Sequence, residues 1–147
     1  MELCVSNSLD TDYLFVCGFA GSGKSSYAKI LAGHYNANFV EVSDIVKNLI
    51  KKRMRSEIAV LPELRTEIVA ALQALTTPLV ISGARQLDII KAFPDSPIIW
   101  IDVPQKLRGE RINRRNEKED DIDITTCDHH DSELGITEIR SYVGREK

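Results

Sequence analysis

The residues from Gly18 to Ser25 have the composition and spacing of a loop that binds phosphate. They read Gly-Phe-Ala-Gly-Ser-Gly-Lys-Ser and match the pattern G-x-x-x-x-G-K-[ST] at every fixed position. Glycines let a backbone approach an anion without Cβ clashes, so its N–H groups can surround a polyphosphate. The lysine would then reach the β- and γ-phosphates, and the serine hydroxyl would ligate Mg²⁺. We therefore expect this segment to bind a nucleoside triphosphate.

The flanking sequence gives the loop the context that this chemistry needs. The apolar run 13–17 predicts a buried strand before the loop, and residues 25–32 predict a helix after it. A helix N-terminus adds free N–H groups and the positive end of its dipole. A chance glycine turn is the alternative. The predicted nucleotide-binding residues are Gly18, Gly21, Ser22, Gly23, Lys24, Ser25 and Ser26.

Bulk composition sets the limits for the rest of the chain. With 147 residues, 43% of them hydrophobic and 28% charged, the chain is expected to form a single domain over residues 1–147. No apolar run is long enough to cross a membrane, and the first residues do not resemble a signal peptide. The three cysteines include no C-x-x-C pair, which is typical of reduced thiols. We expect a cytoplasmic protein (host cytoplasm if viral) with no membrane partner, and its oligomeric state stays open.

Apolar runs alternate with helical patterns along most of the chain. Strands apolar along their whole length indicate a parallel sheet that is covered on both faces. The predicted fold class is therefore α/β, a three-layer α/β/α arrangement with a short parallel sheet of four or five strands. The strands are expected at 13–17, 38–42, 78–82 and 97–103, with helices at 25–32, after Ser43, at 62–75, up to Phe93 and from Pro104. Residues 117–133 are acidic with little apolar periodicity and predict a mobile loop, before a last helix from about 131 or 137 to Tyr142.

Charged residues follow the second, third and fourth of these strands. Asp44 follows the second, Arg85 the third, and an arginine-rich helix the fourth. Arginine binds phosphate oxygens bidentately and stays charged. Arg108, Arg111 and Arg115 recur at spacings of three and four, so one helix face can present all three. A structural ion pair is the alternative for Arg85, and a solvated basic helix face is the alternative for the other three.

In their order along the chain, these segments resemble the nucleotide-kinase branch of P-loop proteins. The resemblance is to dephospho-CoA-kinase-like and phage deoxynucleotide-kinase-like proteins and covers roughly residues 13–139. It implies a P-loop NTPase fold with an arginine-rich lid over about 105–131, and an ATP-dependent kinase that uses Mg²⁺. It also implies that Lys24, Arg111 and Arg115 are catalytic and that Arg85 and Arg108 bind substrate. Its residues are Ser43-Asp44, Gly83-Ala84-Arg85, Ile101-Asp102-Val103-Pro104, Arg108 to Arg115, and His130 to Ile136.

Asp44 has three possible roles. A carboxylate within reach of an acceptor hydroxyl can orient it and accept its proton, and the resemblance implies this catalytic and substrate-binding role. Metal binding through water is a second role, and a carboxylate favoured by the helix dipole is a third. Many of the relatives have Asp-Gly-x-Arg where this chain has Ser82-Gly83-Ala84-Arg85. Without that aspartate, Ser25 and Asp44 are the predicted metal ligands.

The acceptor is suggested by a basic cluster that follows the second strand. Its members are Lys47, Lys51, Lys52, Arg53 and Arg55, with Arg53 as a predicted substrate ligand. The cluster suits a nucleic-acid backbone, and a solvated helix end is the alternative. The chain also resembles small viral kinases that phosphorylate 5-hydroxymethyluracil in DNA, which makes that base in phage DNA the favoured acceptor for DNA hypermodification. A free (deoxy)nucleoside monophosphate, a dephospho-CoA-like acceptor and a non-catalytic NTP-binding switch are the alternatives.

Overall fold

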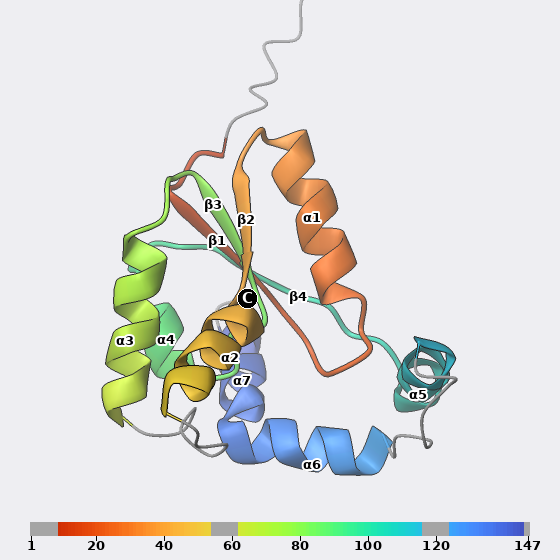
Figure 1. The fold of residues 1–147 in the computed structure, drawn as a ribbon. Helices are drawn as coiled ribbons and strands as arrows, with labels where there is room; N and C mark the ends of the chain where they lie inside the picture. Colours follow the sequence, from red (N-terminus) through yellow and green to blue (C-terminus); the bar gives the residue numbers. More distant parts are fainter. Residues whose placement is uncertain (1–8, 54–61, 116–123, 146–147) are drawn as a thin grey trace, which may run out of the picture.

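A computed structural model describes residues 9–53, 62–115 and 124–145 of the chain. Within these ranges, one sheet has four parallel strands in the order β2-β3-β1-β4 (Figure 1). This confirms the predicted α/β class with a short parallel sheet. The strands are β1 (Tyr13–Cys17), β2 (Asn38–Glu41), β3 (Leu79–Ser82) and β4 (Ile98–Trp100).

Helices cover both faces of the sheet, and their order along the chain follows the predicted alternation (Figure 1). All four strands run in the same direction, so their carboxyl ends meet at one edge. Ligands bind at this edge in open parallel sheets. The helices are α1 (Lys24–His34), α2 (Val42–Arg53), α3 (Pro62–Gln73), α4 (Leu87–Lys91), α5 (Gln105–Arg115), α6 (Ile124–Leu134) and α7 (Ile136–Arg145).

The two faces of the sheet carry unequal layers. On one face α1 packs against the sheet, and its buried residues are Ala28 and Ala32. The small side chains let this helix lie close to the strands. The other face holds the larger core, to which Phe15, Leu64 and Ile139 contribute from β1, α3 and α7. Figure 1 shows α1 on one side and α3, α4 and α7 on the other.

The segment predicted as a mobile loop over 117–133 contains a helix, so that prediction is wrong from Ile124 onward. α6 begins at Ile124 and ends at Leu134, and Figure 1 shows it crossing beneath the carboxyl ends of the strands. Its low apolar periodicity misled the prediction because α6 is docked by charged groups. Asp128 pairs with Arg108, and Asp131 pairs with Arg85. Residues 116–123 of the predicted lid lie outside the described residues.

None of the helices in the described ranges has the length and apolar character needed to span a lipid bilayer.

Candidate active site

The loop between β1 and α1 is shaped by glycines at points where a side chain would collide. Gly21 has a φ of 78°, and a Cβ there would lie 2.7 Å from the carbonyl oxygen of Arg108. A Cβ on Gly18 would lie 2.8 Å from the carbonyl oxygen of Ile101. Both distances are shorter than real contacts allow, so the loop packs against α5 and the β4 end only with glycine at these positions.

This loop lines a cavity of about 580 Å³, called here the first cavity. Its size is ordinary for a site that binds a nucleotide-sized ligand. Of the predicted nucleotide-binding residues, all but Gly18 lie in its wall, and Gly18 packs beneath the loop. The lining residues are Gly21, Ser22, Gly23, Lys24, Ser25, Ser26, Tyr27, Ile101 and Arg111.

The surroundings of Lys24 disfavour the charged form of its side chain. Its Nζ lies 3.4 Å from the carbonyl oxygen of Phe19, which is a long hydrogen bond. Burial, and next the positive charge of Arg85, lower the pKa of the Lys24 ammonium below its ordinary value. The carboxylates of Asp131 and Glu41 act in the opposite direction but do not outweigh these effects. A phosphate oxyanion beside Nζ would supply the missing negative charge, so this lysine is prepared to bind an anion.

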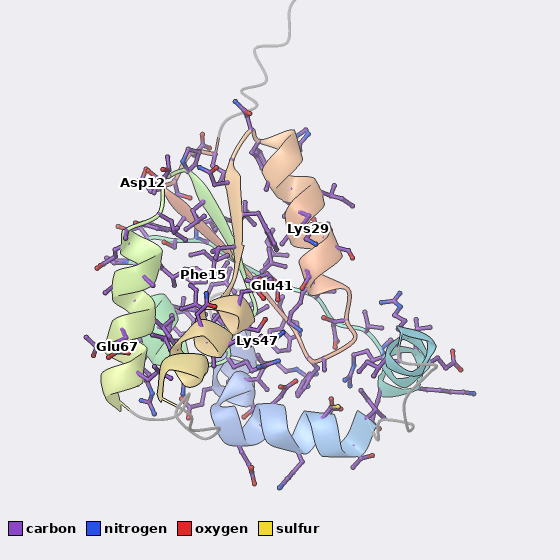
Figure 2. The ribbon with its side chains drawn as sticks, viewed as in Figure 1. Asp12, Phe15, Lys29, Glu41, Lys47 and Glu67 are labelled. Carbon is purple, nitrogen blue, oxygen red and sulfur yellow. The ribbon has the colours of Figure 1, made fainter. Side chains whose placement is uncertain are left out.

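Glu41 is the site residue that sequence reasoning missed. It is the last residue of β2 (Figure 2). In the sheet register it lies opposite Ser82, where many members of the family that the sequence resembles have aspartate. The Ser25 hydroxyl donates to Glu41 Oε1, and the Ser43 hydroxyl donates to Oε2 at 3.0 Å. The strand pairing therefore brings a carboxylate from β2 beside Ser82 on β3. An acidic residue at the end of the predicted second strand was the available signal.

The ionised form of Glu41 is favoured by its surroundings. Burial raises the pKa of this carboxyl, but donation from Ser25, Ser82 and Ser43 and the charge of Lys24 outweigh it, so the net shift is downward. Of these three hydroxyls, that of Ser82 is poorly aligned with the Glu41 carboxylate, because it forms no hydrogen bond of ordinary geometry. A carboxylate with hydroxyl neighbours offers the oxygen ligands that Mg²⁺ prefers.

We expect this pKa shift to appear in the pH dependence of stability. A carboxyl whose folded-state pKa lies below its ordinary value of 4.5 stabilises the fold at neutral pH, and that contribution is lost as the pH falls below 4.5. The Tm of the wild type should therefore fall more steeply than that of Glu41→Gln between about pH 5 and about pH 3. Thermal unfolding followed by circular dichroism measures both curves, and parallel curves would contradict the shift.

Asp44 lies in the first turn of α2, and its side chain is exposed. Among the described residues, it forms no hydrogen bond or ion pair, whereas Glu41 contacts Ser25 directly. Ser25, the predicted metal ligand in the loop, is therefore contacted by Glu41 and not by Asp44. Asp44 remains a proposed site residue.

Arg108 has a different environment from the one predicted for a substrate ligand. Its side chain is buried, and its Nη1 and Nη2 contact the Asp128 carboxylate at 2.6 and 2.9 Å. Its Nε donates to the carbonyl oxygen of Val103 at 2.9 Å, and Nη1 also reaches that of Ala20 at 3.2 Å. All three nitrogens are occupied by protein groups, which argues against the predicted role in binding substrate phosphate. Arg108 instead fastens α5 and α6 to the loop.

Arg111 is the lid-helix arginine that the structure places in the first cavity. Its Nη1 lies 3.4 Å from the carbonyl oxygen of Gly21 and 3.3 Å from that of Ser22. These contacts are long, so a phosphate oxygen can compete for the guanidinium. The side chains of Arg115 and Arg53 lie outside the described residues, although both residues lie within helices.

A second cavity has a volume of about 190 Å³. Arg85 and Ser43 contribute to its wall, so both the predicted substrate arginine and one of the hydroxyls that bind Glu41 belong to it. Glu41 accordingly bonds a residue of each cavity, Ser25 of the first and Ser43 of the second. The remaining wall is largely apolar: the full set is Val42, Ser43, Val46, Lys47, Ile68, Gly83, Arg85, Gln86 and Ile89.

Comparison with known proteins places the fold among the small P-loop kinases. No model of a known protein family matches the chain. A shikimate kinase from Microcystis aeruginosa is 26% identical over 118 residues, which cover 74% of this chain and 61% of that protein. The chain thus spans about three fifths of the length of this curated relative.

Solved structures agree on the fold. The shikimate kinase from Acinetobacter baumannii, in complex with shikimate, superposes with a TM-score of 0.60 at 14% identity, covering 93% of this chain and 80% of that one. A gluconokinase from Sinorhizobium meliloti 1021 gives a TM-score of 0.59 at 17% identity, covering 85% and 75%. The parallel sheet with flanking helices is therefore the sheet of a P-loop kinase fold.

Proposed function

We propose that this protein is an ATP-dependent kinase that transfers the γ-phosphate to a hydroxyl of a small acceptor. The observation that carries the proposal is Glu41, which accepts hydrogen bonds from Ser25 in the first cavity and Ser43 in the second. A phosphoryl group has to pass between a donor and an acceptor held next to each other. Two cavities whose wall residues, Ser25 and Ser43, donate to the same carboxylate would suit this arrangement. The relative and the structural neighbours named above are themselves kinases of small molecules by name.

Each of the described site residues would have its own role in phosphoryl transfer. Loop N–H groups, Lys24 and Arg111 would hold the triphosphate and stabilise the charge that develops on the transferred group. Ser25 and Glu41 would supply oxygen ligands for Mg²⁺, and the ion would supply positive charge to offset that of the triphosphate. Glu41 would also orient an acceptor hydroxyl, which is one of the three roles open to Asp44 and the one that the resemblance implies.

The volume and wall of the second cavity would limit the size and charge of the acceptor. At about 190 Å³ it lies below the roughly 300 Å³ at which pockets for drug-sized ligands begin. Its apolar wall would hold a compact carbon skeleton. Arg85 and Lys47 at the same cavity favour an acceptor that carries a negative charge, such as a carboxylate or phosphate.

The acceptor that the sequence favours, 5-hydroxymethyluracil in phage DNA, is the second candidate. Its support is the basic cluster Lys47, Lys51, Lys52, Arg53 and Arg55. Of these, Lys47 lines the second cavity, and the side chains of the other four lie outside the described residues. Figure 2 shows Lys47 on α2, just beyond Glu41 at the end of β2. A DNA backbone over α2 would pass beside this cavity, so a flipped base could enter it.

An acceptor screen tests the proposal. Purified protein with Mg²⁺ and ATP is incubated with shikimate, gluconate, deoxynucleoside monophosphates, dephospho-CoA, and an oligonucleotide that contains 5-hydroxymethyluracil. Products are read by the mass increase of one phosphate. Transfer to a free small acceptor supports the proposal, and transfer to the oligonucleotide alone supports the DNA candidate. ATP binding without transfer to any of them would favour a non-catalytic NTP-binding switch.

A further inference from the structure

One buried carboxylate on α6 contacts both the phosphate loop and the second cavity. Asp131 is 2% exposed, and its Oδ2 accepts a hydrogen bond from the backbone N–H of Ala20 at 3.1 Å. Its Oδ1 lies 2.9 Å from Nε of Arg85. The Nε–H does not point along this line, so the contact is an ion pair rather than an aligned hydrogen bond. Ala20 and Arg85, which lie far from Asp131 in the chain, thus both contact its side chain.

The carbonyl group of Ala20 is fixed as well. It accepts a hydrogen bond from Arg108, which Asp128 holds through two contacts. Asp128 and Asp131 lie on the same helix, close to one turn apart. The backbone N–H and the carbonyl oxygen of Ala20 are therefore both bound to charged side chains that α6 carries or holds, and hydrogen bonds of this kind are stronger than neutral ones.

We propose that Asp131 is a positioning residue that holds the phosphate loop and Arg85 in one fixed arrangement, so that Arg85 is aligned to bind an anionic group of the acceptor. The Arg85 side chain is 32% exposed, whereas that of Asp131 is 3% exposed. Among the described residues, nothing bonds the two terminal nitrogens of Arg85, which leaves them for a ligand in the second cavity. This inference rests on the proposed function in taking that cavity as the acceptor site.

Two effects of Asp131 on Arg85 have opposite signs, which makes the proposal testable. As a neighbouring negative charge, Asp131 would weaken anion binding at Arg85, and its removal would strengthen it. As a positioning residue, it restricts a long side chain that otherwise loses rotamer freedom when it binds, and its removal would weaken anion binding. A carboxylate fixed by a backbone N–H and withdrawn from solvent favours the second effect.

Asp131→Asn separates the two contacts. Its amide oxygen can still accept from the Ala20 N–H, whereas its NH₂ group then faces the Arg85 guanidinium without a negative charge. We expect KM for the acceptor to rise about tenfold, with KM for ATP changed less than about twofold. The Tm should fall, because the variant removes one partner of a pair in which Asp131 is buried. A lower acceptor KM, or equal rises in both KM values, would overturn the proposal.

Glu133→Gln is the matched control, because it makes the same change on the same helix at a side chain that is 63% exposed and pairs with His129. It should leave both KM values unchanged. In an Arg85→Ala background, Asp131→Asn should have no further effect on acceptor KM, since the two residues act as one unit. Additive effects would show that Asp131 acts independently of Arg85 and would overturn the proposal.

Inorganic phosphate as a probe distinguishes this inference from the proposed function. Phosphate is titrated into protein saturated with Mg²⁺ and a non-hydrolysable ATP analogue, and the Nε–H resonance of Arg85, assigned with Arg85→Lys, is followed by NMR. We expect a saturable shift in the wild type and about tenfold weaker binding in Asp131→Asn. If this holds while no acceptor is phosphorylated, the proposed function fails and the positioning role stands. Equal affinities, or no shift in the wild type, would overturn the positioning role even in an active enzyme.

Discussion

Lys24→Ala should abolish phosphoryl transfer, with a loss in kcat/KM of about 10³-fold or more. The Lys24 ammonium lies in the wall of the first cavity, where burial and Arg85 already lower its pKa. Asp131 and Glu41 compensate its charge only in part, so a bound polyphosphate would supply the remaining negative charge. Fixed cations and donors at such positions contribute roughly 10²- to 10⁵-fold to phosphoryl and acyl transfer. Label transfer from γ-labelled ATP to the acceptor measures the loss.

The same substitution should leave the fold intact. Within the described residues, the Lys24 ammonium bonds the carbonyl oxygen of Phe19 at 3.4 Å and forms no ion pair. Removing a buried cation that is weakly bonded should leave the Tm unchanged or raise it. Lys29→Ala is the matched control, because Lys29 lies on the same helix (Figure 2) but not in the wall of the first cavity, and its Nζ lies over the Phe39 ring. Equal activity losses in the two variants would remove Lys24 from the mechanism.

Glu41→Gln has the second largest expected effect. The variant keeps a side chain of the same shape but loses the charge that orients a hydroxyl and attracts Mg²⁺. We expect kcat to fall by about 10²-fold, and the Mg²⁺ concentration needed for half-maximal rate to rise. ATP binding should change little, since the phosphate loop and Lys24 are retained. Steady-state rates at varied Mg²⁺ concentration, together with calorimetric titration of a non-hydrolysable ATP analogue, separate these effects.

Asp44→Asn decides between the two carboxylates. The sequence proposes Asp44 as base or metal ligand, and the contact with Ser25 favours Glu41. If Glu41 has the role, Asp44→Asn should reduce turnover less than about threefold. A loss of about a hundredfold in Asp44→Asn, with near wild-type turnover in Glu41→Gln, would return the role to Asp44.

The fold could be predicted because its main elements are encoded by local pattern. β1 is a continuous apolar run that ends at a glycine-rich loop, and the observed strand, Tyr13–Cys17, matches the predicted one. The first helix and the β-α alternation follow from equally local signals. Parallel strands with helical connections then leave few topologies, so the sheet and its functional edge were within reach of the sequence.

Other parts of the candidate site could not be predicted because they depend on contacts between residues far apart in the chain. Glu41 became a candidate only when the register set β2 against β3, with Glu41 opposite Ser82. α6 was missed because its docking relies on Asp128 and Asp131 rather than on an apolar stripe, and an acidic segment without its cationic partners predicts a loop. The ion pair of Arg108 was missed for the same reason, since its partner Asp128 lies on that helix.

α1 packs on the sheet through small buried side chains, so a bound nucleotide should also stabilise this helix. Two alanines bury little apolar area compared with the roughly 1.5–3 kcal/mol that one fully buried large side chain contributes. A ligand present at a hundred times its Kd adds about 2.7 kcal/mol to the stability of whatever must be folded to bind it. Because the phosphate loop continues directly into α1, that helix would gain much of its resistance to local opening from the nucleotide. Hydrogen exchange of the α1 amides should therefore slow on saturation far more than that of the α3 amides.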